Sequence, residues 1–359
     1  MIGAQGLGER AEGGPLQPLG RFADALRLDR EAYAGFRAAF GDEHDRALAA
    51  ADALALSLRL TGDFTGAAEQ DRAALAQRGT VLGPGHPAAL YSALALGRDL
   101  REAGDYDGSV EVLRSALAAG PRGQGPETLR ARASLSVSLR RTGRVAEAEV
   151  LAAMAKEGYA ARFPEPEKDP EALACALGRA ALLADSGDAA GACESTRLLL
   201  PQFTRLRGAQ HPDTLTCAHN LAVRLRGTAA FKEAHDLAAS TARALEDTLG
   251  ARHPGTLCAL LTYANALADL HQLDKAEKLG RGCANTLGGV LGRGHPDAVI
   301  GDSNLAVTLR SLGGTAEAER LRGRAVDAFT HRLGGTHPWT VAAMRWQRID
   351  RDLEPHLPS

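Results

Sequence analysis

Apolar positions recur along the chain in blocks of about 42 residues that share one spacing of leucines and small residues. Counted from the first residue of a block, offset +4 is always Leu or Val and offset +11 is always small. Offset +14 is leucine in all seven complete blocks: Leu58, Leu100, Leu139, Leu183, Leu225, Leu267 and Leu309. This spacing places one apolar stripe on a helix from about +1 to +17, and the small residue allows a neighbouring helix to approach closely.

Each block also carries signals for where its helices begin and end. The seven blocks start near residues 44, 86, 125, 169, 211, 253 and 295, and a partial block starts at 337. Proline at +1 suits the first turn of a helix, and glycine at +18, present in five blocks, suits its end. Ala229 and His271 replace that glycine in two blocks. A second helix from about +20 to +35 carries a repeated alanine at +23, so each block is predicted to be a helical hairpin.

The order of a small residue, leucine, glycine and alanine in a helix-turn-helix unit resembles the tetratricopeptide repeat. The LGxxHPxTL stretch between hairpins and the 42-residue period resemble the kinesin-light-chain type of this family. The resemblance covers about residues 20 to 353 and implies an all-α solenoid, a right-handed superhelix of helical hairpins. The ending Arg348-Ile-Asp-Arg-Asp-Leu-Glu-Pro355 further resembles bacterial, actinobacterial proteins of the FxSxx-COOH peptide-modification systems.

The predicted organisation is one superhelical domain over residues 19–353. Residues 1–18 are rich in glycine and lack periodicity, which predicts a disordered leader, and residues 354–359 are predicted to be a tail. A capping helix is expected from Pro338 to about Leu353. The connection at 163–170 and Pro201 late in a predicted helix suggest a bend within 160–205.

Composition narrows the function classes. A net charge of −2 argues against a nucleic-acid-binding protein, and no apolar run approaches the roughly 20 residues that span a membrane. The absence of a signal-peptide pattern predicts a cytoplasmic protein. Five cysteines without a CxxC pair are expected to be buried thiols in a reducing compartment.

The repeated His-Pro dipeptides raise the question of a metal site. Equivalent residues of adjacent hairpins lie roughly 10 Å apart, whereas ligands must converge within about 2 to 2.5 Å of one ion. The histidines are therefore expected to cap or pack the turns, and no metal or cofactor is predicted. No nucleotide-binding, metalloprotease or hydrolase motif is present, so the chain is not expected to be an enzyme.

The predicted site is the concave groove of the solenoid, which the first helix of each hairpin lines in the resembling family. Offset +15 is arginine in five of seven blocks, and Arg98 joins Arg101 as the best pair for a ligand contact. Asparagines on this face could hold a peptide backbone. The candidate residues are Arg59, Arg98, Arg101, Arg140, His219, Asn220, Arg226, Asn265, Asn304 and Arg310. The alternative is that each arginine pairs with an acidic residue of a neighbouring second helix and only supports the stack.

These residues predict a non-catalytic scaffold that binds a protein or peptide, with an acidic or C-terminal segment as the best match to guanidinium groups. Within an FxSxx-type system the partner would be a precursor peptide or a modifying enzyme. A second hypothesis is a ligand-sensing module that switches a nucleotide-binding or effector partner through the 160–205 bend. Whether the chain is a monomer or a homodimer stays open.

Overall fold

The computed structural model describes residues 22–120 and 125–355. Within these residues the regular structure is entirely helical, with sixteen α-helices and one short 3-10 helix, and no strand. The first helices in chain order are α2 (Phe22–Phe40), α3 (Asp45–Leu60), α4 (Phe64–Leu82), α5 (Pro87–Glu102), α6 (Tyr106–Ala119), α7 (Pro126–Arg141) and α8 (Val145–Arg162). After η1 (Pro166–Lys168) follow α9 (Pro170–Asp185), α10 (Ala189–Arg207), α11 (Pro212–Gly227), α12 (Phe231–Leu249), α13 (Pro254–Asp269), α14 (Leu273–Val290), α15 (Pro296–Ser311), α16 (Thr315–Leu333) and α17 (Pro338–Met344).

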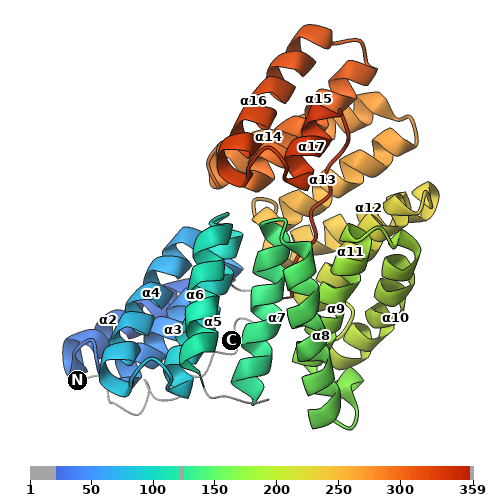
Figure 1. The fold of residues 1–359 in the computed structure, drawn as a ribbon. Helices are drawn as coiled ribbons and strands as arrows, with labels where there is room; N and C mark the ends of the chain where they lie inside the picture. The colour runs from blue at the N-terminus through green and yellow to red at the C-terminus, as the bar shows by residue number, and fades with distance from the viewer. Residues whose placement is uncertain (1–21, 121–124, 356–359) are drawn as a thin grey trace. The chain divides into compact units, whose positions relative to one another are not determined.

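These helices form antiparallel hairpins in two compact units (Figure 1). The first unit contains the described residues up to 139 together with 153–158, and the second contains 140–152 and 159–355. Within the second unit the first helices of successive hairpins pack side by side, α11 on α13 and α13 on α15. The all-α solenoid prediction is confirmed. That residues 19–353 form a single domain stays a prediction, and the leader at 1–18 lies outside the described residues.

The repeated histidines cap the first helices. His44, His86, His211, His253, His295 and His337 each occupy the N-cap position. In every case Nδ1 accepts the backbone N–H two residues later, at 3.0–3.2 Å. Each ring thereby satisfies one of the unpaired N–H groups of a helix start. The capping interpretation is confirmed, and the described residues contain no cluster of three candidate metal ligands.

Hydrophobic side chains are buried at the positions that the periodicity predicts. In the second unit Leu257, Leu261, Leu287 and Phe329 form one cluster that Ile349 joins from the C-terminal segment. The described part of the chain has no helix long and apolar enough to cross a membrane. All five cysteines carry buried thiols.

Pro201 lies inside helix α10, which runs on to Arg207, and Leu199 and Phe203 on either side of the proline are buried in the hairpin core. The bend within 160–205 stays a prediction. One expectation about a helix end is wrong. The final helix begins at Pro338 as predicted but ends at Met344 instead of near Leu353. Trp346 then adopts a φ of 58°, which turns the chain out of the helical path.

The turn position +18 has a left-handed backbone even where glycine is absent. Gly62, Gly104 and Gly313 have φ of 81–86°, and the two departures, Ala229 and His271, have φ of 60°. A side chain in this region costs about 1–2 kcal/mol relative to glycine. The fold therefore imposes the turn, and two repeats carry a local strain.

Replacing Ala229 with glycine is expected to relieve that strain. We expect Ala229→Gly to raise the free energy of unfolding by about 0.5–1 kcal/mol, since the gain is partly offset by the greater freedom of glycine in the unfolded chain. Gly313→Ala, at a turn with φ of 86° and open space around the added methyl, is the matched reverse change and should lower it by about 1 kcal/mol. Urea denaturation measures both, and a destabilised Ala229→Gly variant would contradict the strain argument.

Candidate functional site

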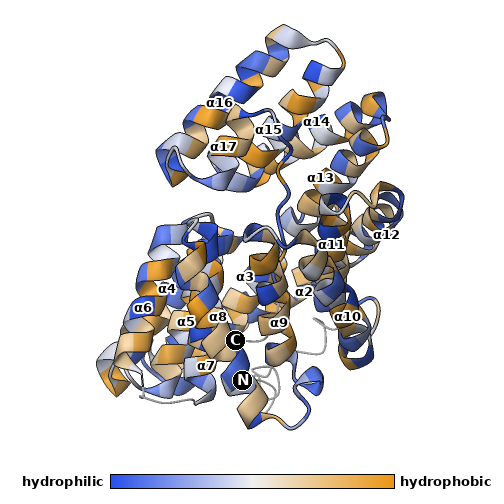
Figure 2. Ribbon diagram, turned by 45° about the vertical axis from the view of Figure 1, so that its right-hand side comes forward, coloured by the Kyte–Doolittle hydropathy of each residue, from blue (hydrophilic) through white to orange (hydrophobic). Residues whose placement is uncertain are grey.

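The segment after α17 lies against the first helices α11, α13 and α15 of the second unit, and we call this helix face the groove. We call residues 345–355 the strap. It leaves α17 and runs as a non-helical thread past α15, α13 and α11 (Figure 1). Most of its residues are hydrophilic (Figure 2). Ile349, Arg351 and Asp352 are nevertheless buried, so the strap is an integral part of this unit.

Two asparagines hold the strap by its backbone. Asn304 of α15 donates from Nδ2 to the carbonyl oxygen of Ile349 at 2.8 Å and accepts the N–H of the same residue at 2.8 Å. Asn220 of α11 makes the same pair of bonds with Leu353, at 3.0 and 2.9 Å. We call each such pair an asparagine clamp. A clamp satisfies one backbone donor and one backbone acceptor of a segment that forms no secondary structure. These bonds do not depend on the side chain of the clamped residue.

Two further buried side chains bond the strap between the clamps. Asn265 of α13 donates from Nδ2 to the carbonyl oxygen of Ile349 at 3.4 Å and to Oδ1 of Asp350 at 3.2 Å. Nε2 of His219 lies 2.8 Å from the carbonyl oxygen of Arg351. Since a carbonyl oxygen only accepts, His219 is protonated on Nε2.

Charged side chains pair with the strap on both sides. Asp350 binds Arg226, which also binds Asp269 at 2.6 Å. Asp352 binds Arg224 and, at 3.0 Å, Arg140. The residue between these two aspartates is a cation and has an acidic partner: Arg351 lies 2.5 Å from Asp297 of α15. The groove therefore matches alternating charges, Asp-Arg-Asp.

The electrostatics of Asp352 show how strongly the groove favours an anion there. Burial by itself would raise the pKa of Asp352, but the guanidinium groups of Arg224, Arg140 and Arg141 outweigh burial and hold the pKa below its usual range. Arg141 also donates to the Asp352 carbonyl oxygen at 2.6 Å. The carboxylate is thus ionised at all physiological pH values.

The strap begins with a stacked aromatic ring. The guanidinium of Arg310 lies 4.5 Å from the ring centroid of Trp346, and that of Arg322 lies 4.8 Å from it. Such cation–π contacts contribute about 0.5–2 kcal/mol depending on exposure. They anchor the strap where it leaves α17.

The ten residues expected in the groove have two different environments. Seven contact the strap: Arg140, His219, Asn220, Arg226, Asn265, Asn304 and Arg310. The other three, Arg59, Arg98 and Arg101, are buried in the first unit. Arg101 donates to Ser138 at 2.7 Å, and Arg59 binds Asp99 and Asp71.

The +15 arginines pair with acidic residues in two ways. Arg59 binds Asp71 of the second helix α4, as in the alternative considered above, whereas two others pair with the next first helix. Arg140 binds Asp185 at 3.0 Å, and Arg226 binds Asp269. Both partners stand at +16 of the following first helix and not on a second helix. These two arginines therefore join neighbouring hairpins and contact the strap at once.

Sequence reasoning missed the strap and its partners Arg224 and Asp297. The signal available was the tail itself, where Ile349 and Leu353 frame alternating charges after the last proline-started helix. The capping helix predicted to about Leu353 extends through that pattern. Arg224 at +13 and Asp297 at +2 do not stand at +15, the offset whose repeated arginines indicated the groove.

Comparisons with known proteins agree with this architecture. Tetratricopeptide repeat family models match residues 52–122, and residues 16–45 and 214–255. No curated protein sequence matches the chain. Many solved structures are similar to it, and three of them are described below.

The first is NprR in complex with its cognate peptide NprX, at TM-score 0.60 and 12% identity, covering 92% of each chain. The second is a Rap protein complexed with competence and sporulation factor, at TM-score 0.58 and 12% identity, covering 95% of this chain and 96% of that one. A putative kinesin light chain from Podosopora anserina has TM-score 0.42 and 22% identity, covering 56% of this chain and 95% of that one. Similarity at these identities concerns the fold.

Protonation of the buried groove histidine should weaken the second unit. Burial lowers the pKa of His219 below its usual 6.5, so the unfolded chain binds the proton more readily than the folded one. We expect the free energy of unfolding to fall as pH drops below about 6.5, by about 1.4 kcal/mol for each unit of pKa difference.

The contribution of His219 can be separated from that of other histidines. His211 and His337 also have lowered pKa values because of burial, and they add to the same slope. His219→Gln keeps a donor without a titrating ring, so urea denaturation at pH 7.5, 6.5 and 5.5 should give a shallower slope than in the unchanged protein. An equally steep slope in the variant would rule out His219 as a contributor, and exposed His331→Gln is the control.

A buried carboxylate pair in the first unit predicts the opposite pH trend. Burial, together with the neighbouring Asp99, raises the pKa of Asp71 to about 9 beside Arg59. Since the unfolded value is near 3.8, this group stabilises the fold fully below that pH and loses its contribution as pH rises toward 9. We expect Asp71→Asn to be more stable than the unchanged protein at pH 8 and to remove much of this slope.

Asp99→Asn is the matched comparison, because it removes the carboxylate that is paired with Arg59. We expect that change to lower the free energy of unfolding by about 3–5 kcal/mol. Equal effects of the two asparagine substitutions at pH 8 would contradict the assignment of the proton to Asp71.

Proposed function

Because the chain is a tetratricopeptide repeat protein, we propose that it is a non-catalytic scaffold whose second unit holds an extended segment of a partner protein along α11, α13 and α15. The observation that carries the proposal is the pair of asparagine clamps, Asn304 on Ile349 and Asn220 on Leu353. Backbone bonds of this kind suit any extended chain. In the structure the strap fills this place, and the partner segment would replace it.

Several features support the proposal. The four polar groups that hold the strap backbone from α11, α13 and α15 are themselves buried: His219, Asn220, Asn265 and Asn304. Buried polar side chains that point at a non-helical segment are costly unless that place is filled. The similar NprR and Rap structures hold, by their own descriptions, a cognate peptide and competence and sporulation factor.

The chemistry of the groove refines the ligand class. Arginines alone would favour an acidic or C-terminal segment, yet Asp297 lies in the same groove and binds Arg351. The strap residues bonded there, 349–353, are internal to the chain. We propose a mixed-charge internal segment as the ligand. A precursor peptide or modifying enzyme of an FxSxx-type system is a narrower proposal on the resemblance of the tail.

A second candidate function is a ligand-sensing module that switches a nucleotide-binding or effector partner. One observation favours it: the strap is a separate element that a ligand could displace, which supplies two states. The unbroken helix α10 makes the 160–205 region a weaker choice for that role. Both functions use the same groove, and sensing requires that strap release changes the affinity for the partner.

The test uses the whole chain with a strap that cannot bind in the groove. Ile349→Glu with Asp352→Arg places a carboxylate in an apolar cluster and a guanidinium against Arg224, while every groove residue is unchanged. We call this protein the open variant. A labelled peptide of residues 345–355, RWQRIDRDLEP, is titrated into it and into the unchanged protein.

We expect saturable one-to-one binding to the open variant. The unchanged protein should bind the peptide at least about 10-fold more weakly, because its own strap competes at an effective concentration in the millimolar range. Adding Asn220→Ala and Asn304→Ala to the open variant should remove about 10- to 100-fold of affinity per clamp. Exposed Asn285→Ala is the matched control. A folded open variant that ignores the peptide, or clamp substitutions without effect, would refute the proposal.

A further inference from the structure

The charged side chains that hold the strap differ in the ion pairs that they would retain if the strap left the groove. Arg226 also binds Asp269 at 2.6 Å, and Arg140 also binds Asp185 at 3.0 Å, so both retain an anion inside the solenoid. Asp297 and Arg224 are different. The ion pairs found for them are with Arg351 and Asp352, two neighbouring residues of the strap.

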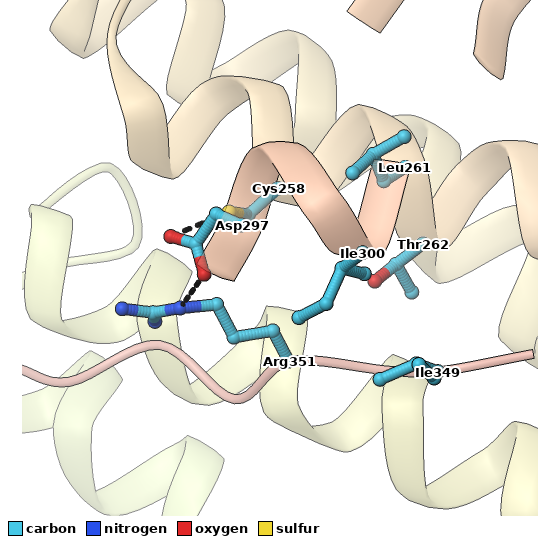
Figure 3. Close-up of a pocket in the computed structure, with 7 residues that line it drawn as sticks. All are labelled: Cys258, Leu261, Thr262, Asp297, Ile300, Ile349 and Arg351. Carbon is cyan, nitrogen blue, oxygen red and sulfur yellow. Dashed lines mark hydrogen bonds and ion pairs between the residues drawn. The ribbon is translucent and has the colours of Figure 1, made fainter. Parts of the chain in front are cut away.

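Asp297 forms a small site for one guanidinium group. It lies in the first turn of α15, is 2% exposed, and places Oδ1 2.5 Å from Nε of Arg351. Its other oxygen, Oδ2, accepts from Sγ of Cys258 at 3.7 Å. Figure 3 shows the carboxylate between that thiol and the Arg351 side chain, with Leu261, Thr262 and Ile300 on the apolar side.

Emptying that site would be costly. A buried carboxylate without a counter-charge loses both hydration and its partner. A planar guanidinium suits such a site better than a compact ammonium, because it is less strongly hydrated. Asp297 thus selects for arginine at one position of any occupant.

Arg224 selects the next residue. Its guanidinium is 9% exposed and donates from Nη2 to Oδ1 of Asp352. Apolar contacts frame the two charges: Ile349 is 4% exposed in the cluster of Leu261 and Ile300, and Leu353 packs against the cluster of Leu215 and Ala259. The Ile349 and Leu353 backbones are also the ones that the asparagines clamp.

We infer that the groove is specific for an Arg-Asp pair set between two clamped apolar residues, an extended partner segment of the form Ile/Leu-x-Arg-Asp-Ile/Leu. Asp297 and Arg224 are the specificity-determining residues. This inference rests on the proposed function and adds the class of segment that the groove binds. The position of Asp350 tolerates other residues, because Arg226 stays paired with Asp269 when no carboxylate occupies that position.

The test measures the affinity of the open variant for three peptides of residues 345–355. One carries the natural sequence, one carries Arg351→Gln, and one carries Asp350→Asn. We expect the Arg351→Gln peptide to bind about 100-fold more weakly or worse, since it leaves a buried carboxylate unpaired. The Asp350→Asn peptide should lose less than about 10-fold, since the Asp350 side chain is 22% exposed and its partner Arg226 is also paired with Asp269.

Asp297→Asn in the open variant completes a double-mutant cycle with nearly unchanged shape. In the open variant with Asp297→Asn, the affinities for the natural and Arg351→Gln peptides should differ by less than about 10-fold. Equal affinities of these two peptides for the unchanged groove, or an undiminished difference in the Asp297→Asn groove, would overturn the specificity while leaving the proposed function standing. If none of the peptides binds a folded open variant, both proposals fail.

Discussion

The second unit depends on the need of a buried, non-helical backbone to have its hydrogen bonds satisfied. The strap has no strand or helix partner, so its N–H and C=O groups must be met by side chains. Asparagine is suited to this because one amide offers a donor and an acceptor side by side. Asn304 and Asn220 stand at the same offset, +9, two repeats apart, and each engages one strap residue. The repeat architecture thus sets the spacing of the clamps.

The charges add selectivity to this neutral framework. Buried ion pairs contribute little net stability, because desolvation offsets attraction, yet breaking one is strongly unfavourable. The strap therefore matters less as a source of stability than as a chemical complement of the groove. Arg140 and Arg226 each join a neighbouring helix to the strap, so an occupant also bridges successive hairpins. Replacing the occupant would alter contacts between repeats, which connects a binding function with a sensing one.

The repeats were predictable from sequence because their chemistry is periodic. Leucine at +14, proline at +1 and the capping histidines depend on local helix geometry, which recurs in every block. The asparagines of the groove could be predicted as backbone-binding groups for the same reason. At +18, Ala229 and His271 departed from the glycine rule, but packing of the hairpins imposed the turn on them.

The strap could not be predicted from those rules because it occurs once and its contacts are distant in sequence. Asn220 and Leu353 are 133 residues apart, and no periodicity relates them. Arg59, expected in the groove from its offset, instead binds two buried acidic side chains of its own unit, Asp71 and Asp99. An offset identifies a helix face, but what covers that face depends on tertiary packing. The same limit explains why Asp297, a first-turn residue by sequence, was not assigned to the groove.

Hydrogen exchange of the strap amides in the unmodified full-length protein tests the central claim most directly. The N–H groups of Ile349 and Leu353 are bonded to Asn304 and Asn220. The amides of a peptic fragment covering residues 345–355 should therefore exchange with deuterium much more slowly than those of an unstructured chain. Substitution of both asparagines with alanine should abolish that protection while the helices remain protected. A strap that exchanges as fast as an unstructured peptide in the unmodified protein would contradict the account.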